Sequence, residues 1–507
     1  MGNFPQVNHI DPTPVAITLH DHLADHHFME TPVLPAVEAM EILAAEVLSD
    51  DSSASVDLLT DAEFKKFLPL DPSRKMMELQ AQMHPAADGH LRATLVSRTR
   101  SPKAAITRTK EHAAMTFGRA ADDAYPMPLD VAVAPEGVCE TVAQNKIYRE
   151  LVPFGPAYRN ITAPVWLSDD GALALIQCPD LPCCSRTNHL GSPFALDAAF
   201  HAACVWGQHY YKMVAFPLAV DKRRILKPTV SNETYYGRVI PVQTGPDLLV
   251  FDIWLLDRSG TICEIVEGVR MRDVSGGRLK PPRWIERKAQ DDPLAVLRER
   301  CSDLCLIELD AVAAFAPRGL TELENQRFQR MQPRRKRSYL GARMALKRLS
   351  RKLSDGMPQT PSHALHTHDA DGARPCCASP ADGVSFYCSA SHNRRFAVAA
   401  AAKTPLGIDV ETVTDRAVRC GPIFMSETEQ LLLHRTTLGL PQTAVRIWSA
   451  KEAVAKAKKI PLAEAWHRTE ITSVEAGVSR LTVDGRQPGE AVHAVVDDSI
   501  FTLFVCG

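Results

Sequence analysis

The sequence lacks an apolar run of about 20 residues, the length that a membrane-spanning helix needs. It also lacks an excess of either charge, since 58 Lys and Arg stand against 60 Asp and Glu. This balance disfavours attraction of the whole molecule to nucleic acid or to an anionic membrane. Residues 1–14 show no basic segment followed by an apolar stretch, as a secretory signal would. We therefore expect a soluble, cytoplasmic protein with no membrane or nucleic-acid partner.

The cysteine pattern lacks the spacing of a metal or redox motif. The chain has 13 cysteines, and the closest pairs, Cys183 with Cys184 and Cys376 with Cys377, are adjacent. Metal-binding and redox motifs usually separate two cysteines by two residues. The sequence therefore predicts reduced, structural thiols.

The length and the composition predict several domains. A chain of 507 residues holds roughly two to four domains. Gly, Pro and charged residues gather at 276–295, and a weaker break lies between 125 and 136. We therefore predict domains at 1–125, 136–275 and 296–507, with a linker at 276–295.

The hydrophobic patterns predict an α+β fold class. Each of the first two portions has one apolar helix, at 35–48 or 194–206, followed by alternating segments typical of strands. These strands are expected at 77–83, 91–99, 234–242, 248–256 and 261–272. A helix wrapped by an antiparallel sheet, occurring twice, is a double hotdog. The third portion mixes helices and strands, expected at 322–330, 339–352, 385–389 and 396–402.

Two motifs in the third portion predict a metal site. The segment GIDVE at 407–411 places Asp409 and Glu411 two residues apart, so on a strand they share a face. Two carboxylates there can bind one hard cation. The segment WSAKEAVAK at 448–456 adds Glu452 as a third oxygen ligand, with Lys456 one turn further along the same helix face.

This pair of motifs resembles the signature of the Sfp-type 4′-phosphopantetheinyl transferases, GIDxE followed by WxxKEAxxK. The resemblance implies transfer of 4′-phosphopantetheine from coenzyme A to a serine of an acyl carrier protein. Asp409, Glu411 and Glu452 would bind magnesium, and Lys456 would steady a phosphate. Either Glu452 or a metal-bound water would accept the serine proton.

Other segments of the third portion resemble the coenzyme A contacts of that family. SASHN at 389–393 is similar to its SxSH segment, which implies that Ser391 and His392 contact coenzyme A. Arg337 and Arg343 match an RxxxxxR pattern for the 3′-phosphate and adenine, and Arg374 stands where the family has a phosphate-binding Lys. For 347–352 we expect a solvated basic helix face. The other basic residues of the block 327–352 could dock the acidic helix of an acyl carrier protein. Nucleic-acid binding is the weaker alternative for this block, because Phe328 and Tyr339 are its only aromatic residues.

The first half resembles the dehydratase domains of polyketide and fatty acid synthases. His26 precedes Pro35 as in HxxxGxxxxP, FGPAY at 154–158 is similar to YGPxF, and LDAAFH at 196–201 is similar to LDxxxH. The resemblance implies a double hotdog that removes water from 3-hydroxyacyl carrier thioesters. His26 would be the base and Asp197 the acid, protonated in apolar surroundings and hydrogen-bonded by His201.

One residue departs from this motif, because Glu30 replaces its Gly. A charged side chain at a position where the family brings backbone close to the acyl chain keeps two alternatives open. The hotdog region is then an inactive module that docks carriers beside an active transferase, or the whole chain is a non-enzymatic scaffold for carriers and coenzyme A.

The order of the two regions resembles the C-terminal end of enediyne-type iterative polyketide synthases. Ketosynthase, acyltransferase and carrier sequences do not occur in these 507 residues. We therefore expect a partner, a polyketide or fatty acid synthase, to supply them. Hotdog regions often pair, so a homodimer through this region stays open.

Overall fold

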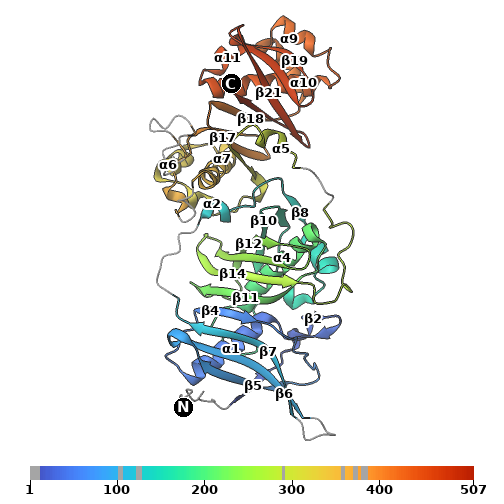
Figure 1. Cartoon of the computed structure of the whole chain (residues 1–507), viewed down its shortest axis with the longest axis vertical. Coiled ribbons are helices and arrows are strands. Elements are labelled where there is room, and N and C mark those ends of the chain that lie inside the picture. Colours follow the sequence, from blue (N-terminus) through green and yellow to red (C-terminus); the bar gives the residue numbers. More distant parts are fainter. Residues whose placement is uncertain are drawn as a thin grey trace, which may run out of the picture. The chain divides into compact units, whose positions relative to one another are not determined.

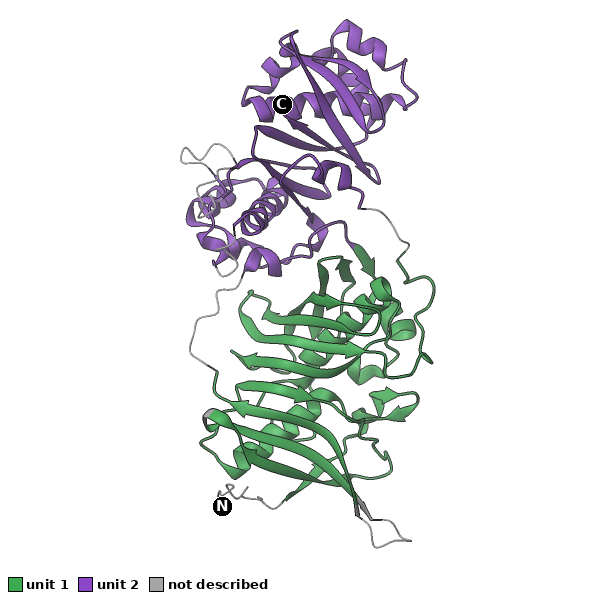
Figure 2. Cartoon of the chain, in the orientation of Figure 1, with its two compact units in different colours: residues 1–124, 140–287 green, residues 125–139, 288–507 purple. Residues whose placement is uncertain are grey.

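The computed structural model describes residues 12–100, 107–120, 128–185, 187–287, 292–354, 360–368, 375–377 and 386–506. The chain forms two compact units (Figures 1 and 2), one of residues 1–124 and 140–287 and the other of residues 125–139 and 288–507. Residues 136–139, which we expected at the start of the second hotdog, thus belong to the C-terminal unit.

The first unit is a double hotdog built on one 12-stranded sheet in the order β1-β5-β6-β7-β4-β11-β14-β13-β12-β10-β9-β8. Antiparallel pairing of β4 with β11 joins the two hotdogs, with Leu59 opposite Arg223. The strands are β1 (Thr13–Thr18), β4 (Leu58–Glu63), β5 (Met76–Pro85), β6 (Leu91–Arg100), β7 (Thr107–Gly118), β8 (Glu140–Val142), β9 (Val165–Ser168), β10 (Gly171–Gln177), β11 (Phe216–Ile225), β12 (Thr234–Thr244), β13 (Leu249–Asp257) and β14 (Ile262–Arg272).

Two apolar helices, α1 (Ala36–Asp50) and α4 (Pro193–Tyr211), form the core of this unit. Residues of α4 are buried from Pro193 through His209, so this helix has no solvent face along most of its length. A helix that is apolar all round is a buried helix. α1 packs against β6 and β7, and α4 packs against β10 and β12 (Figure 1), as the hotdog prediction required.

The second unit contains two antiparallel sheets and is α+β. The first sheet has the order β15-β17-β16 and carries α7, and the second has the order β18-β22-β21-β20-β19 and carries α10. Its elements are α2 (Leu129–Ala132), α5 (Ala295–Arg298), β15 (Asp303–Glu308), α6 (Glu322–Arg330), α7 (Pro333–Lys352), β16 (Tyr387–His392), β17 (Phe396–Ala402), β18 (Leu406–Thr412), α8 (Asp415–Phe424), α9 (Glu427–Leu432), α10 (Leu440–Lys458), α11 (Leu462–Arg468), β19 (Thr469–Val474), β20 (Val478–Val483), β21 (Gln487–Val496) and β22 (Ser499–Val505).

The helices and strands expected from the sequence are present among the described residues. The ends of 322–330 and 396–402 are as predicted, and the other elements are shifted at one or both ends. The largest shift is in the helix expected at 339–352, which begins at Pro333 instead. Proline is favoured in the first turn of a helix, where its missing N–H costs no hydrogen bond. Among the described residues, no helix combines the length and the apolar character needed to cross a membrane.

Gly407 allows β18 to lie directly against α10. A Cβ at this position would lie 1.9 Å from the carbonyl oxygen of Ala453 on α10. Because the helix backbone cannot move aside cheaply, only glycine fits. This close approach brings the motif on β18 beside the motif on α10.

We expect Gly407→Ala to lower the free energy of unfolding of the second unit by about 1–3 kcal/mol, the usual cost of overpacking. Denaturant titration would measure the change. The matched control is Gly477→Ala, where a Cβ meets nothing within 4 Å and the effect should stay below about 0.5 kcal/mol. Equal stability of the two variants would contradict this explanation.

Candidate active sites

Three carboxylates converge where β18 meets α10 in the second unit. Asp409 and Glu411 lie on β18, Glu452 lies on α10, and one oxygen from each lies within 4.8 Å of the others. Asp409 is 1% exposed, and the other two are half-buried. The structure therefore brings together the three residues predicted to bind a metal.

The charges of this cluster fit a divalent cation. Burial and the negative charge of Asp409 raise the pKa of Glu411 to about 7 and that of Glu452 to about 8. Clustered carboxylates repel one another, and a bound cation removes that repulsion. A ligand set made only of oxygen atoms suits magnesium.

Asp409 is fixed by three donors. Ser391 Oγ donates to Oδ1 at 2.8 Å, Ser449 Oγ donates to Oδ2 at 2.7 Å, and Lys456 Nζ donates to Oδ1 at 2.8 Å. Burial raises the pKa of Asp409, but Lys456 and the two hydroxyl groups outweigh it and keep this carboxyl ionised. Ser391 and Lys456, which we expected on coenzyme A, thus bind the metal-site carboxylate in this ligand-free structure.

Basic side chains gather beside the carboxylates. His392 is exposed at the end of β16. Partial desolvation and the positive charge of Lys456 lower the pKa of His392, and Arg335 on α7 adds to the effect. Three basic groups near one another form a region that favours phosphate. Arg335 was missed from the sequence, because the RxxxxxR pattern selected Arg337 and Arg343 instead.

Two of the three arginines predicted to bind coenzyme A have protein partners. Arg337 pairs with Asp310 and donates its Nε to the Leu309 carbonyl at 3.2 Å. Arg343 is buried and donates to Thr367 Oγ1 at 2.9 Å. Arg374 lies outside the described residues. The roles of these three residues stay predictions.

A cavity of about 730 Å³ lies beside the carboxylates and is lined by Glu452 and Lys456 from α10 and by Tyr387 and Cys388 from β16. Cys388 forms a disulfide with Cys377, whose Cα lies 6.2 Å away. The prediction that all cysteines are reduced is therefore wrong. Adjacency in the sequence drew attention to Cys376 and Cys377, whereas the fold pairs cysteines 11 residues apart.

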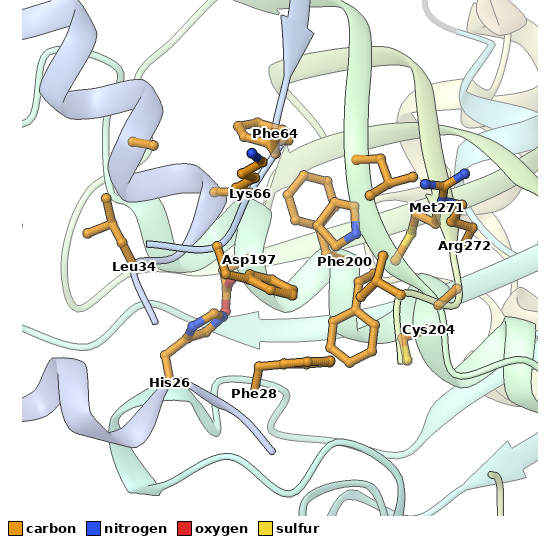
Figure 3. Close-up of a pocket in the computed structure, with 18 of the residues that line it drawn as sticks. His26, Phe28, Leu34, Phe64, Lys66, Asp197, Phe200, Cys204, Met271 and Arg272 are labelled. Carbon is orange, nitrogen blue, oxygen red and sulfur yellow. The ribbon is translucent and has the colours of Figure 1, made fainter. Parts of the chain in front are cut away.

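The first unit has a separate cavity of about 540 Å³ with a largely aromatic and aliphatic lining. His26 and Asp197, far apart in the sequence, both line it. In Figure 3 the Asp197 carboxylate points toward the His26 ring, with Phe28 and Phe200 nearby. The structure thus brings together the predicted base and acid.

His26 is prepared to act as a base. Its Nδ1 lies 3.0 Å from the Val33 carbonyl oxygen, so Nδ1–H donates there and the Nε2 lone pair stays free. Burial lowers the pKa of His26 despite the nearby charge of Asp197, so the ring is neutral at pH 7. A neutral imidazole at a substrate cavity can accept a proton.

Asp197 is ionised, and the prediction that apolar surroundings hold it protonated is wrong for this ligand-free structure. His201 Nε2 lies 3.0 Å from Asp197 Oδ2, one helical turn away. Burial raises the pKa of Asp197, but the charge and hydrogen bond of His201 outweigh it and lower the pKa below its usual value.

Glu30 has a left-handed backbone conformation, which glycine adopts without strain. Met29 and Glu30 have φ values of +48° and +65° and form the turn between β2 (His27–Phe28) and β3 (Thr31–Pro32). Two left-handed residues are typical of a tight hairpin. The Glu30 side chain is exposed and does not line the cavity. The substitution therefore strains the turn without blocking the site.

Comparisons with known proteins match two parts of the chain. Residues 128–281 match the family model for the polyketide synthase dehydratase N-terminal domain, and residues 405–506 match that for the 4′-phosphopantetheinyl transferase superfamily. Polyketide synthase PksM of Bacillus subtilis (strain 168) is 22% identical over 277 residues, which cover 52% of this chain but only 6% of that protein.

Solved structures with similarity to the chain include polyketide synthase dehydratase domains. The dehydratase domain from the CurF module of curacin polyketide synthase has a TM-score of 0.43 at 18% identity, covering 53% of this chain and 96% of its own. A trans-AT dehydratase domain from Brevibacillus brevis has a TM-score of 0.43 at 17% identity, covering 53% and 97%.

Proposed function

We propose that this chain, which carries a polyketide synthase dehydratase domain followed by a 4′-phosphopantetheinyl transferase domain, serves an acyl carrier protein twice. It primes the carrier with phosphopantetheine and dehydrates the 3-hydroxyacyl thioester that the carrier later bears. The observation that carries the proposal is the convergence of Asp409, Glu411 and Glu452. A polyketide or fatty acid synthase supplies the carrier.

The priming reaction joins a carrier serine to the phosphorus atom of coenzyme A that carries the pantetheine. The serine oxygen forms the new P–O bond, the bond to 3′,5′-adenosine bisphosphate breaks, and the serine proton passes to Glu452 directly or through water. Lys456 and His392 hold the phosphates. Asp409, Glu411 and Glu452 would hold magnesium, which would supply positive charge to the pyrophosphate of coenzyme A.

Priming should depend on Asp409 and on magnesium. With coenzyme A, magnesium and an apo carrier protein, mass spectrometry should show addition of phosphopantetheine, and Asp409→Ala should slow it by about 100-fold or more because the buried ligand is lost. EDTA should stop transfer and added magnesium should restore it. Asp497→Asn, an exposed acid in the same unit, is the control. Transfer by Asp409→Ala at the full rate would refute the proposal.

The dehydration reaction uses the cavity of the first unit. His26 Nε2 takes the proton next to the thioester carbonyl, and the Asp197–His201 pair gives its proton to the 3-hydroxyl. The C–O bond then breaks, water leaves, and a double bond forms between carbons 2 and 3. Phe28, Phe200 and the rest of the apolar lining enclose the acyl chain.

Dehydration of a 3-hydroxyacyl carrier should fall by about 10²- to 10⁴-fold in His26→Ala, the usual contribution of a general base. Because burial lowers the pKa of His26, kcat/KM should decline only as the pH falls below the ordinary value of about 6.5. Liquid chromatography with mass spectrometry would measure the product.

Glu30→Gly is the matched control for this test. It should retain the activity and stabilise the first unit by about 1 kcal/mol, since glycine adopts positive φ without strain. If the wild-type chain binds the carrier but leaves its substrate unaltered, the hotdog region is a docking module instead.

The exposed face of α8 supports an acidic carrier as the partner. Arg416, Arg419 and Ile423 lie at helical spacing on one face, and Ile423 is 64% exposed. The positive charge of Arg416 opposes the rise in the pKa of Glu411 that burial and Asp409 cause. Arg416 is therefore close to Glu411, and this face adjoins the carboxylates. Positive charge around an exposed apolar residue complements an acidic amphipathic helix.

Arg419→Glu should raise the KM for the carrier by roughly 10-fold, because a like charge would face an acidic carrier. The KM for coenzyme A should stay unchanged, and added salt should reduce the difference. Arg486→Glu, an exposed arginine in the turn between β20 and β21, is the matched charge reversal. Steady-state kinetics with varied carrier would test this, and equal effects of both variants would contradict the docking face.

A further inference from the structure

Residues 128–139, here called the strap, belong to the second unit although they connect the two hotdogs (Figure 2). The strap contains α2, and its Glu136 forms a β-bridge with Ile307 on β15. The Cys139 N–H donates to Glu308 Oε2 at 3.0 Å. A segment from between the hotdogs thus completes the transferase unit.

The strap is fixed to α7 by a buried carboxylate. Asp130 is 0% exposed, and Arg351 donates its Nε to Oδ2 and its Nη2 to Oδ1, both at 2.8 Å. Ser362 Oγ also donates to Oδ1 and accepts from the Asp130 N–H at 3.0 Å. A two-pronged arginine pair is among the strongest polar contacts in proteins. Losing the carboxylate charge would remove the ion pair that joins the strap to Arg351.

A second arginine of α7 binds the strap backbone. Arg348 is buried and donates its Nε to the Asp130 carbonyl at 2.6 Å and its Nη2 to the carbonyls of Val131, at 2.9 Å, and Ala134. Lys347 is buried as well. The prediction of a solvated basic face at 347–352 is therefore wrong for Lys347 and Arg348, whereas Lys352 is exposed. The partners of Arg348 lie 214 to 218 residues away in sequence, where helix periodicity could not reveal them.

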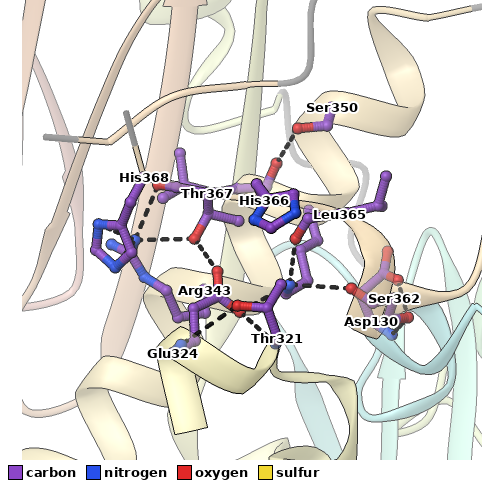
Figure 4. Close-up of polar contacts among 12 residues, drawn as sticks. Asp130, Thr321, Glu324, Arg343, Ser350, Ser362, Leu365, His366, Thr367 and His368 are labelled. Atoms are coloured by element: carbon purple, nitrogen blue, oxygen red, sulfur yellow. Dashed lines mark hydrogen bonds and ion pairs between the residues drawn. The ribbon is translucent and has the colours of Figure 1, made fainter. Parts of the chain in front are cut away.

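The contacts continue from the strap toward the ligand region (Figure 4). Lys347 Nζ donates to the Ser362 carbonyl at 3.0 Å and pairs with Glu324 at 2.8 Å. Thr367 Oγ1 donates to Glu324, and Arg343 donates to Thr367. Every step joins buried polar groups, so the network couples the strap to residues 362–368.

Residues 362–368 lead to the cavity of the second unit. His368 forms a β-bridge with Pro375, and Pro375 lines the 730 Å³ cavity beside Lys456. At its other end, α7 carries Arg335, close enough to affect His392. Both the helix and the loop that the network fixes thus reach the region assigned above to coenzyme A.

We propose that the strap is a positioning element of the transferase, and that Asp130 holds α7 and residues 362–368 where they bind coenzyme A. This proposal rests on the transferase function proposed above. Asp130 is a positioning residue, because it acts through Arg351 and Ser362. The transferase then requires a segment that precedes the second hotdog, and residues 288–507 alone lack part of it.

Asp130→Asn in the full chain tests this. The variant keeps the shape but removes the charge, so the KM for coenzyme A should rise about 10-fold while kcat stays within about twofold, the split expected when only binding is weakened. The matched control is Asp484→Asn, whose carboxylate makes the same two-pronged contact with Arg468, at 2.7 and 2.8 Å, on the surface. It should behave as wild type.

Ser362→Ala is a milder variant for the case that Asp130→Asn does not fold. It removes the hydrogen bonds of Ser362 Oγ with Asp130 but keeps the Asp130–Arg351 pair, and it should raise the KM for coenzyme A two- to threefold. Double replacement of Asp130 by Asn and Arg351 by Gln should cost less than the sum of the two single replacements, because the two side chains interact directly. Changes no larger than those of Asp484→Asn would overturn the positioning role.

Hydrogen exchange separates this proposal from the proposed function. Asp130→Asn should speed exchange in α7 and at 360–368 and leave the first unit unchanged, whether or not the chain transfers phosphopantetheine. If the wild-type chain transfers no phosphopantetheine but Asp130→Asn still speeds exchange, the transferase function is refuted and the positioning role of the strap is supported. Unchanged exchange would refute the strap even if transfer is active.

Discussion

A buried carboxylate needs donors, and this requirement organises the second unit. Asp409 receives two hydroxyl groups and Lys456, and Asp130 receives Arg351 and Ser362. The first carboxylate fixes β18 against α10, and the second fixes α7 against the strap. Because an unpaired buried charge is strongly unfavourable, these contacts determine where each helix lies, and the ligand residues follow from them.

In the first unit, an acid and a base line one apolar cavity and differ in their charge. His26 is neutral because burial lowers its pKa, whereas Asp197 is ionised because His201 lies 3.0 Å away. Sequence reasoning found all three residues and misjudged the charge of one. Apolar neighbours alone suggested a protonated Asp197, but a single close histidine outweighs them.

The sequence predicted those features that depend on residues close together in the chain. The apolar runs of α1 and α4 and the motifs around Asp409 and Glu452 were clear, since burial and short spacing leave marks in adjacent residues. The Arg348 contacts, the Cys377–Cys388 disulfide and the role of Arg335 were not, because each depends on partners that only the fold brings near. Glu30 departs from the sequence motif, and only the structure shows that its side chain is exposed and does not line the cavity.

The strap also sets an order on folding. Asp130 and Arg351 are 221 residues apart, so during synthesis the strap leaves the ribosome before the second hotdog and long before α7. Domains usually fold as they emerge, and a contact of this separation closes late. The strap therefore cannot form its contacts with Arg348 and Arg351 until α7 has also been synthesised.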